Sequence, residues 1–445
     1  MKNPDLTKGN INSLLKKIAI PASVGFAFNT LFNVVDSIYA GQISTDTLAG
    51  MAIAFPIFFL IISISSGFGN GVTALSAISI GEKDVKSFHA YALNALLLAV
   101  IVGVLLPVLS PLFLEPLFKL SGSTGNVLQV GMEYTTVILF GTIFFVLNFV
   151  LNGLLNAQGN TKPFRNYLII GFFANLILDP LFILGWFGLP KMGASGVALA
   201  TVIVQAFGTV YLTYHLIKSE LFDMKLFKEA KPSFKTIRAL LNQGIPSSLN
   251  NATIALGVFI INYFVLLYGG TETVAAYGVS MRIEQMALLP TIGITVAVLS
   301  IVGQNFGANK IDRIYEVRKK GTIYGVGIML IGTVIIVPLA PFLIGLFDSS
   351  DVVVNAGTQY LRIEAFAFTT YIFLNIGVSV LQGIKKPKFG LWIGLYRQLL
   401  PFALFYFLGT TLGMGILGVW WGIVFINWTA VFITIFYTKL QLKKL

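Results

Sequence analysis

The sequence contains no cysteine among its 445 residues and only two histidines, His89 and His215. The absence of cysteine excludes disulfides, thiol catalysis and thiolate metal sites. Both histidines fall near the ends of predicted helices, which argues against a site for a transition metal, because histidine is the commonest ligand of those ions. HExxH, GxSxG and GxxxxGK[ST] motifs are absent as well. We therefore predict neither an enzyme nor a bound cofactor.

Charge is also scarce, because charged residues make up 11% of the chain and hydrophobic residues 56%. The mean hydropathy is +0.84. A soluble domain of this length would lack polar cover for its surface. Apolar runs near the length of a bilayer span repeat from end to end, so we predict an all-α integral membrane protein. We expect no cleavable signal peptide, because the first 17 residues are polar and the first apolar run is too long.

The apolar runs predict twelve transmembrane helices. Their ranges are 17–41, 48–78, 88–117, 130–153, 164–187, 193–217, 242–268, 274–303, 320–347, 358–383, 389–412 and 415–438.

The net charge of +12 is distributed by topology rather than gathered in a patch for nucleic acid. Lys and Arg concentrate in the even-numbered connections and in both terminal segments, whereas the odd-numbered connections contain only Lys119, Lys191 and Arg362. Basic residues accumulate on the cytoplasmic side of membrane proteins. We therefore predict a multi-pass protein of the cell inner (plasma) membrane, with both termini in the cytoplasm, the lipid bilayer as its surroundings and no nucleic acid partner.

Two related copies make up the chain. QGNTKP at 158–163 returns as QGIKKP at 382–387, 224 positions later, and AIP at 19–21 returns as GIP at 244–246, 225 positions later. Gly81 matches Gly307 at an offset of 226. Many secondary transporters are built from such repeats. We predict an N-terminal lobe at 1–217, a cytoplasmic linker with an amphipathic helix at 218–241, and a C-terminal lobe at 242–445.

Ionisable groups inside membrane spans are costly and indicate a functional site. Asp36 lies inside the first predicted helix and Asp179 inside the fifth, where Asn175 shares its face at i, i+4 spacing. At about 1.5 Å per residue both carboxylates reach the outward half of the membrane. Thr201 and Tyr134 fall at similar depth. This set of oxygens suits a small hard cation such as Na⁺ or a proton-accepting pair. The alternative is that the polar groups only hold the helices together.

The second copy lacks this cluster, which favours a function confined to the first. The repeat offsets map Asp36 onto Ile261, Asn175 onto Leu399 and Asp179 onto Ala403. Arg282 and Glu284 in the eighth predicted helix and Arg397 in the eleventh are better explained by pairing between helices.

Along essentially its whole length the chain resembles the multidrug and toxic-compound extrusion (MATE) transporters. The resemblance is carried by the IAIP opening, by FNVVDSIYAGQIST around Asp36, and by LNAQGNTKP. Further matching stretches are FFANLILDPLFI with GASGVALAT, and YGVSMRIEQM followed by IVGQNFGAN. The resemblance implies twelve transmembrane helices in two pseudo-symmetric six-helix lobes around a central cavity. It also implies a monomer that exports bulky, often cationic aromatic drugs or toxic compounds in exchange for H⁺ or Na⁺.

Carried over residue by residue, Asp36, Asn175, Asp179 and Thr201 match the family's first-lobe site for a proton or Na⁺, and Tyr134 matches it less closely. The NorM branch of the family also uses acidic residues in its seventh and tenth helices. The seventh helix here has no Asp or Glu, and the tenth has Glu364 near its predicted outer end. The chain therefore looks like the DinF branch.

Three rival functions remain. A flippase for lipid-linked saccharides, from the same superfamily, would need a cationic cavity for pyrophosphate, yet only Arg282 and Arg397 lie inside the predicted helices. A membrane-embedded enzyme would need a catalytic constellation beyond Asp36 and Asp179. A channel fits poorly with a cation cluster in one half only. Efflux by antiport is the function that the sequence favours.

Overall fold

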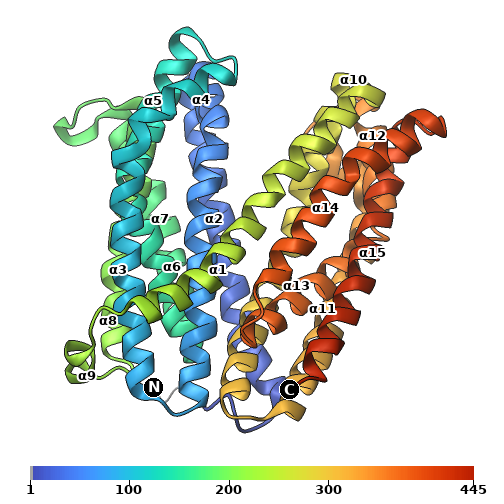
Figure 1. Cartoon of the computed structure of the whole chain (residues 1–445). Coiled ribbons are helices and arrows are strands. Elements are labelled where there is room, and N and C mark those ends of the chain that lie inside the picture. The colour runs from blue at the N-terminus through green and yellow to red at the C-terminus, as the bar shows by residue number, and fades with distance from the viewer. Residues whose placement is uncertain (1–3) are drawn as a thin grey trace. The chain divides into compact units, whose positions relative to one another are not determined.

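The computed structural model describes residues 4–445, and every regular element in that range is a helix (Figure 1). The first half contains α1 (Ile11–Ile43), α2 (Thr45–Gly81), α3 (Val85–Leu109), η1 (Ser110–Leu112), α4 (Leu114–Leu120), α5 (Gly125–Phe140), α6 (Thr142–Ala157), α7 (Lys162–Leu184), η2 (Trp186–Gly188), α8 (Gly193–Ile217) and α9 (Met224–Glu229). The second half contains α10 (Phe234–Gly307), α11 (Ile311–Gly345), α12 (Asp351–Glu364), α13 (Phe368–Gly383), α14 (Lys388–Tyr406), η3 (Phe407–Thr411) and α15 (Ile416–Leu442).

Within residues 4–445, nine helices are long and apolar enough to cross a membrane, or up to 11 if each of two bent helix pairs is one span. One of the nine, α10, has 74 residues. At about 1.5 Å per residue it would be more than three times as long as a bilayer core is thick. Gly270, with φ 74° and ψ −176°, interrupts its helical backbone. If α10 is counted as two spans, the total of up to 11 membrane spans becomes twelve. This is the number of transmembrane helices predicted from the sequence.

Four helix starts lie six or more residues earlier than the hydropathy pattern predicts. The structure begins α1 at Ile11, α10 at Phe234, α11 at Ile311 and α12 at Asp351, whereas the sequence predicts starts at 17, 242, 320 and 358. Hydropathy marks only the apolar part of a helix, but a helix continues through polar residues that lie beyond the bilayer. The predicted linker therefore contains only the six-residue helix α9, capped by the Asp223 side chain, before α10 starts.

The chain forms two compact units. One contains Val24–Leu249 and the residues up to Leu6, and the other contains Thr7–Ser23 and Asn250–Leu445. The unit boundaries thus fall inside α1 and inside α10, whereas the sequence pattern places the division in the linker between them. Each of these two helices begins in one unit and continues in the other.

Corresponding helices of the two halves begin at a constant spacing. The starts of α11, α12, α13 and α14 follow those of α3, α5, α6 and α7 by 226 positions each (for example 351 − 125). The α5–α6 pair bends by 46°, and its counterpart α12–α13 bends by 51°. The copies recognised in the sequence therefore share their helix plan and their broken span.

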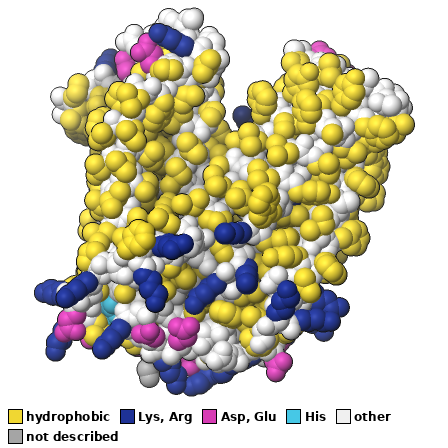
Figure 2. All heavy atoms as spheres, viewed as in Figure 1, with side chains coloured by type: hydrophobic (Ala, Val, Ile, Leu, Met, Phe, Trp, Pro, Cys, Tyr) yellow, Lys and Arg dark blue, Asp and Glu magenta, His cyan; other side chains and the backbone are white. Residues whose placement is uncertain are grey.

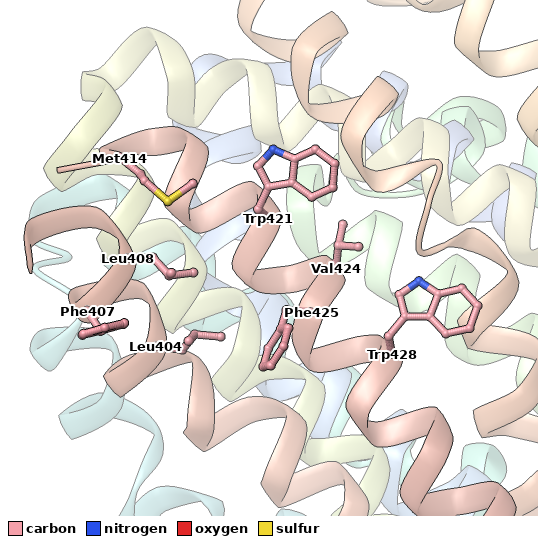
Figure 3. Close-up of a pocket in the computed structure, with 8 residues that line it drawn as sticks. All are labelled: Leu404, Phe407, Leu408, Met414, Trp421, Val424, Phe425 and Trp428. Carbon is pink, nitrogen blue, oxygen red and sulfur yellow. The ribbon is translucent and has the colours of Figure 1, made fainter. Parts of the chain in front are cut away.

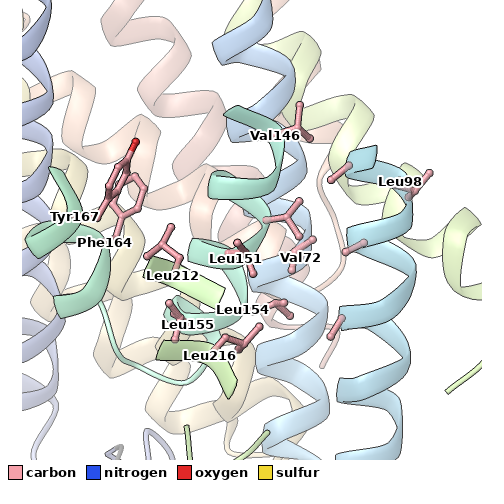
Figure 4. Packing of buried hydrophobic residues seen from close by; sticks show 14 of the residues in the cluster. Val72, Leu98, Val146, Leu151, Leu154, Leu155, Phe164, Tyr167, Leu212 and Leu216 are labelled. Carbon is pink, nitrogen blue, oxygen red and sulfur yellow. The ribbon is translucent and has the colours of Figure 1, made fainter. Parts of the chain in front are cut away.

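Buried apolar side chains, most of them from α2, α3, α6, α7 and α8, form a core cluster in the first unit (Figure 4). It includes Val72, Leu151 and Tyr167. In lipid, close contact between small residues holds helices together. A Cβ on Gly69 would meet the Phe149 carbonyl oxygen at 2.7 Å, so α2 and α6 pack this closely because the residue is glycine. Figure 2 shows hydrophobic side chains over the middle of each unit and Lys and Arg side chains gathered towards one end.

Candidate functional site

Three helices of the first unit bring the proposed polar residues together. Asp36 comes from α1, Asn175 and Asp179 come from α7, and Thr201 comes from α8. Their exposed fractions are 5% or less, so all four are buried. The i, i+4 spacing of Asn175 and Asp179 places both on the face of α7 that is buried.

The Asn175 side chain links the two acidic residues. Its Nδ2 donates to Asp36 Oδ1 at 2.5 Å and to Asp179 Oδ2 at 2.8 Å. One amide thus uses both of its hydrogens on the two carboxyl groups. Asn175 Oδ1 and Asp179 Oδ1 are buried and have no hydrogen-bond partner. Two acceptor oxygens therefore remain for a ligand that carries positive charge.

Thr201 completes the bonds to Asp36. Its Oγ1 donates to Asp36 Oδ2 at 3.2 Å and lies 3.1 Å from the Val197 carbonyl oxygen of its own helix. Such bonding back to the preceding turn fixes the hydroxyl on the helix surface. Both oxygens of Asp36 are therefore oriented by neutral donors.

Tyr134 of α5 has a different place from the other four residues. It is 7% exposed and belongs to an apolar cluster with Ile61, Phe145 and Val197. Its phenol is close enough to interact electrostatically with both Asp36 and Asp179. Among the described residues no hydrogen bond joins it to the other four. Tyr134 thus forms part of the apolar surroundings of the carboxyl pair.

Within the described part of the chain, no basic side chain forms an ion pair with either carboxyl group. The salt bridges found within residues 4–445 are Lys119–Glu115 and Lys320–Glu316, both i, i+4 pairs on helix surfaces. Two buried carboxylates without a counter-charge repel each other and are poorly solvated. Binding a proton or a monovalent cation reduces both costs. The oxygen donors fit Na⁺ but not a transition metal, and no group of three His, Cys, Asp or Glu occurs in the described part of the chain.

A second polar network in the first unit escaped the sequence analysis, because none of its members is charged. Asn148 Nδ2 donates to Gln205 Oε1 at 2.7 Å, and Tyr167 Oη donates to the same oxygen at 2.8 Å. Thr209 Oγ1 donates to Asn148 Oδ1 at 3.0 Å. The sequence pattern that could have revealed this network is the pair Gln205 and Thr209, two polar residues at i, i+4 spacing in an apolar helix.

The second unit contains an apolar cavity of about 550 Å³ between α14, η3 and α15 (Figure 3). It is lined by Leu404 of α14, by Phe407 and Leu408 of η3, by Met414, and by Trp421, Val424, Phe425 and Trp428 of α15. Phe407, Met414, Trp421 and Phe425 are 38–56% exposed, so this is an open apolar hollow rather than an enclosed ligand pocket.

Comparison with protein families finds the two copies of the chain again. A family model described as MatE matches residues 21–181 and again residues 246–407. The two matches begin 225 positions apart, the spacing at which AIP returns as GIP. One family unit is thus present twice, and the two matches include Asp36, Asn175 and Asp179 in the first copy and Glu284 and Glu364 in the second.

Curated relatives are similar over most of the chain. A probable multidrug resistance protein NorM of Thermotoga maritima is 26% identical over 420 residues, which cover 93% of this chain and 89% of the relative. An FAD transporter of Shewanella oneidensis is 26% identical over 403 residues, covering 89% and 87%. One relative is described as a probable multidrug resistance protein and the other as a transporter of FAD, so the similarity alone does not identify the compound that this chain moves.

A solved structure has the same fold as this chain. It is described as the outward-facing conformation of a multidrug resistance MATE family transporter of the MOP superfamily. The TM-score is 0.93 at 26% identity, and the match covers 100% of this chain and 98% of the other. The all-helical fold predicted from the sequence is therefore confirmed.

Proposed function

Because this chain belongs to the MatE family, whose members are membrane transporters and not enzymes, we propose that it is a secondary active multidrug efflux antiporter. It exports bulky, often cationic aromatic compounds and takes up H⁺ or Na⁺ in exchange. The transporter alternates between an outward-open and an inward-open state and uses no cofactor. The observation that carries the proposal is the buried pair Asp36 and Asp179, joined through Asn175.

The carboxyl pair is the coupling site. Asp36 is the primary acceptor of the incoming ion, and Asn175 holds it beside Asp179, so one added positive charge interacts with both. Thr201 orients Asp36. With Na⁺ as the ion, oxygens of Asp36, Asn175, Asp179 and Thr201 form its ligand set. Tyr134 restricts access of water to the pair from its apolar cluster.

Ion binding drives the cycle only if it stabilises one state more than the other. The site satisfies this condition if α1, α7 and α8 bring the carboxyl groups together in one state and separate them in the other. One charge crossing about 100 mV contributes roughly 2.3 kcal/mol, enough for about a fifty-fold gradient of the exported compound. ATP is therefore not required.

The remaining assignments follow from the charge pattern and from the family. We place the protein in the cell inner membrane with both termini in the cytoplasm, because basic residues concentrate in the connections of that side. It functions as a monomer, and its partners are the bilayer and small-molecule drugs or toxic organic cations.

The test is transport in proteoliposomes of the purified protein loaded with ethidium, a cationic aromatic dye. A Na⁺ gradient and a pH gradient are imposed separately, and dye fluorescence reports its movement. One gradient should drive transport by the wild-type protein. The Asp36→Asn variant should insert normally but should show no gradient-driven transport, because the amide cannot take up the ion.

The matched control is Asp312→Asn, which removes an exposed carboxylate from the first turn of α11. It should transport like the wild-type protein. Wild-type rates in the Asp36→Asn variant would remove the coupling role of Asp36. Absence of transport of any tested dye by the wild-type protein under both gradients would overturn efflux as the function.

A further inference from the structure

The predicted linker, residues 218–241, carries six basic and three acidic residues, a net charge of +3. Lys218 is occupied near α8, because its Nζ donates to Tyr214 Oη at 2.6 Å. Within residues 4–445 none of the other five forms an ion pair. All five are exposed, and together we call them the basic face: Lys225, Lys228, Lys231, Lys235 and Arg238.

The helix α9 buries its apolar side and turns its lysines outward. Phe227 packs on Phe222 with ring centres 5.2 Å apart, and both rings lie against the core cluster of the first unit. Lys225 and Lys228 are exposed, and their i, i+3 spacing places them on the same side of the helix. Asp223 accepts a hydrogen bond from Lys225 N at 2.7 Å, so its carboxylate caps the helix.

Two buried side chains of α3 fix the backbone of the linker. Asn94 Nδ2 donates to the Lys231 carbonyl oxygen at 3.3 Å, and Asn94 Oδ1 accepts a hydrogen bond from Ser233 N at 2.9 Å. His89 Nε2 accepts a hydrogen bond from Asp223 N at 2.8 Å. Asn94 and His89 are both 0% exposed. A connection that only had to span two helices would not need these bonds, so they hold the basic face in one position on the first unit.

The first turns of α10 join the basic face to an apolar stripe. Phe234 is 80% exposed, and Ile245 and Leu249 are 45% and 46% exposed. Arg238 is exposed as well, and the spacing of 4, 11 and 15 residues from Phe234 places all four on one side of the helix. These residues belong to the first unit. In that unit, Lys and Arg side chains gather at the end where α9 lies (Figures 1 and 2).

Helix stability and topology do not explain this arrangement. Lys235 and Arg238 lie in the first two turns of α10, where the helix dipole disfavours positive charge, and no acidic residue offsets them in the first turn. A basic connection on the cytoplasmic side requires only the charge and not a fixed position. An aromatic ring as exposed as that of Phe234 is typical of a membrane interface. The features together indicate a partner with an anionic head and an apolar part.

We propose that the basic face binds anionic phospholipid of the leaflet on its own side of the membrane. Lys231, Lys235 and Arg238 hold the phosphate, and the acyl chains lie along Ile245 and Leu249. Ile245 follows Arg238 by seven residues, which at about 1.5 Å per residue is roughly 10 Å along the helix. The long stems of Lys and Arg cover part of this distance while their charges stay at the headgroups. Lys225 and Lys228 attract further anionic headgroups.

This inference goes beyond the proposed antiport. It depends on the membrane surroundings of a transporter and not on the ion that Asp36 takes. The linker joins the two copies of the chain, so a bound lipid would fix the start of the second copy on the first unit. The lipid composition of the leaflet would then act on the segment that connects the copies.

The experiment measures which lipid lies beside α10. Asn242 is exposed one turn beyond Arg238, and the chain has no cysteine, so Asn242→Cys can carry a single NBD fluorophore. The protein is reconstituted in vesicles of phosphatidylcholine and phosphatidylglycerol in fixed proportion. The same mole fraction of nitroxide-bearing lipid is either phosphatidylglycerol or phosphatidylcholine. Quenching should show a preference for phosphatidylglycerol of at least about fivefold, the contribution of one basic residue at a membrane surface.

The preference should disappear when Lys231, Lys235 and Arg238 are all replaced by Gln. The matched control replaces Lys385, Lys386 and Lys388 by Gln, which removes three exposed basic residues from the turn before α14 and should leave the preference intact. All six side chains are exposed, so both triple variants should fold.

Three results would overturn the proposal. The first is equal quenching by both nitroxide lipids in the labelled parent protein. The second is the same preference in both triple variants, because the basic face would then have no special role. The third is a loss of quenching with inorganic phosphate that NaCl of equal ionic strength does not cause, which would indicate a site for a free anion. The readout needs no transport, so failure of the proposed antiport would not affect it.

Discussion

Ser23 and Ser248 occupy equivalent places in the two copies, 225 positions apart, and each donates its hydroxyl to a backbone carbonyl of another helix. Ser23 Oγ lies 2.9 Å from the Pro290 oxygen, and Ser248 Oγ lies 3.1 Å from the Ile64 oxygen. The two acceptors are themselves 226 positions apart. Both serines also stand at the points where α1 and α10 pass from one unit to the other. The duplication thus preserved a contact as well as a helix plan.

Two glycines make these contacts possible, and they provide the first prediction. A Cβ on Gly67 would collide with the backbone of Ser248, and a Cβ on Gly293 would collide with Ser23 and the Ala19 carbonyl. We expect Gly67→Ala and Gly293→Ala each to lower stability by about 1–3 kcal/mol through overpacking. Thermal unfolding in detergent measures the effect.

The control for these variants is Gly278→Ala in the same helix as Gly293, where an added Cβ meets no atom within 4 Å. It should leave the protein unchanged or stabilise it by up to about 1 kcal/mol through helix propensity. Equal melting temperatures for Gly67→Ala, Gly293→Ala and Gly278→Ala would show that the close contacts do not exist.

Thr201 tests the hydrogen bonds around Asp36. Thr201→Val keeps the shape of the side chain but removes the donor to Asp36 Oδ2. A hydrogen bond to a charged group contributes about 1.5–3 kcal/mol, so the ion concentration that gives half-maximal dye transport should change roughly tenfold or more. Thr201→Ser keeps the hydroxyl and should behave like the wild-type protein. Identical ion dependence in the Val and Ser variants would exclude this role for the hydroxyl.

The sequence was most informative where a polar residue lay in an apolar run. Asp36, Asn175 and Asp179 are conspicuous because a charge or amide inside a span must have a partner, and helical spacing then places two of them on one face. The offset of 224 positions, which the sequence analysis used to find the counterparts of Asn175 and Asp179 in the second copy, was less accurate. The helix starts of α7 and α14 differ by 226, so Asn175 corresponds to Pro401 and Asp179 to Phe405. The second copy still lacks acidic residues at these places.

Partners of the second-unit charges could not be predicted, because they depend on distant helices. Nothing local to Glu284 indicates that Tyr360 would donate to it from 76 residues away. The start of α12 at Asp351 was missed because hydropathy does not detect the polar first turns of this helix. The break at Gly270 has a local cause, since φ of 74° is a conformation that glycine adopts readily. Glycine is too frequent in membrane helices for this position to stand out, however.

Asp84 gives a pH-dependent prediction outside the membrane spans. It caps α3, and its side chain accepts hydrogen bonds from Ser87 Oγ at 2.6 Å and from Ser87 N at 2.9 Å. These bonds hold the pKa of Asp84 below its usual value. Because the pKa is lower in the folded state than in the unfolded state, the stabilisation is complete above the unfolded pKa of about 3.9 and is lost as the pH falls through the folded value.

Replacing Asp84 should therefore lower the stability of the protein at neutral pH but not in acid. Asp84→Ala should lower stability by about 1 kcal/mol at pH 7, and the difference from the wild-type protein should shrink as the pH falls below about 4. Glu82→Ala removes a nearby carboxylate that caps no helix start and serves as the control. A difference for Asp84→Ala that stays constant down to acid pH would contradict a charged cap.

His89 anchors the segment that precedes α10. Its Nε2 accepts a hydrogen bond from the Asp223 backbone N–H at 2.8 Å, which leaves Nδ1 as the donor to the Val85 carbonyl at 2.7 Å. This neutral tautomer ties α3 to the start of α9. His89→Phe should release the segment and accelerate trypsin cleavage after Lys225 and Lys228. His215→Phe is the control, because the ring contacts of His215 are with Tyr211 and Tyr214 of its own helix. Unchanged cleavage in His89→Phe would mean that other contacts hold α9.

The membrane topology is open to a direct test, because a chain without cysteine is ready for single-cysteine labelling. Ser121, in the turn after α4, and Lys386, in the turn before α14, are both exposed and belong to connections of opposite predicted sides. In intact cells, a membrane-impermeant maleimide should label Ser121→Cys and should leave Lys386→Cys unlabelled until the membrane is permeabilised. The opposite pattern would place both termini outside the cytoplasm. It would also reverse the direction in which Asp36 takes up its ion, since the basic connections and the depth of Asp36 are counted from the same side.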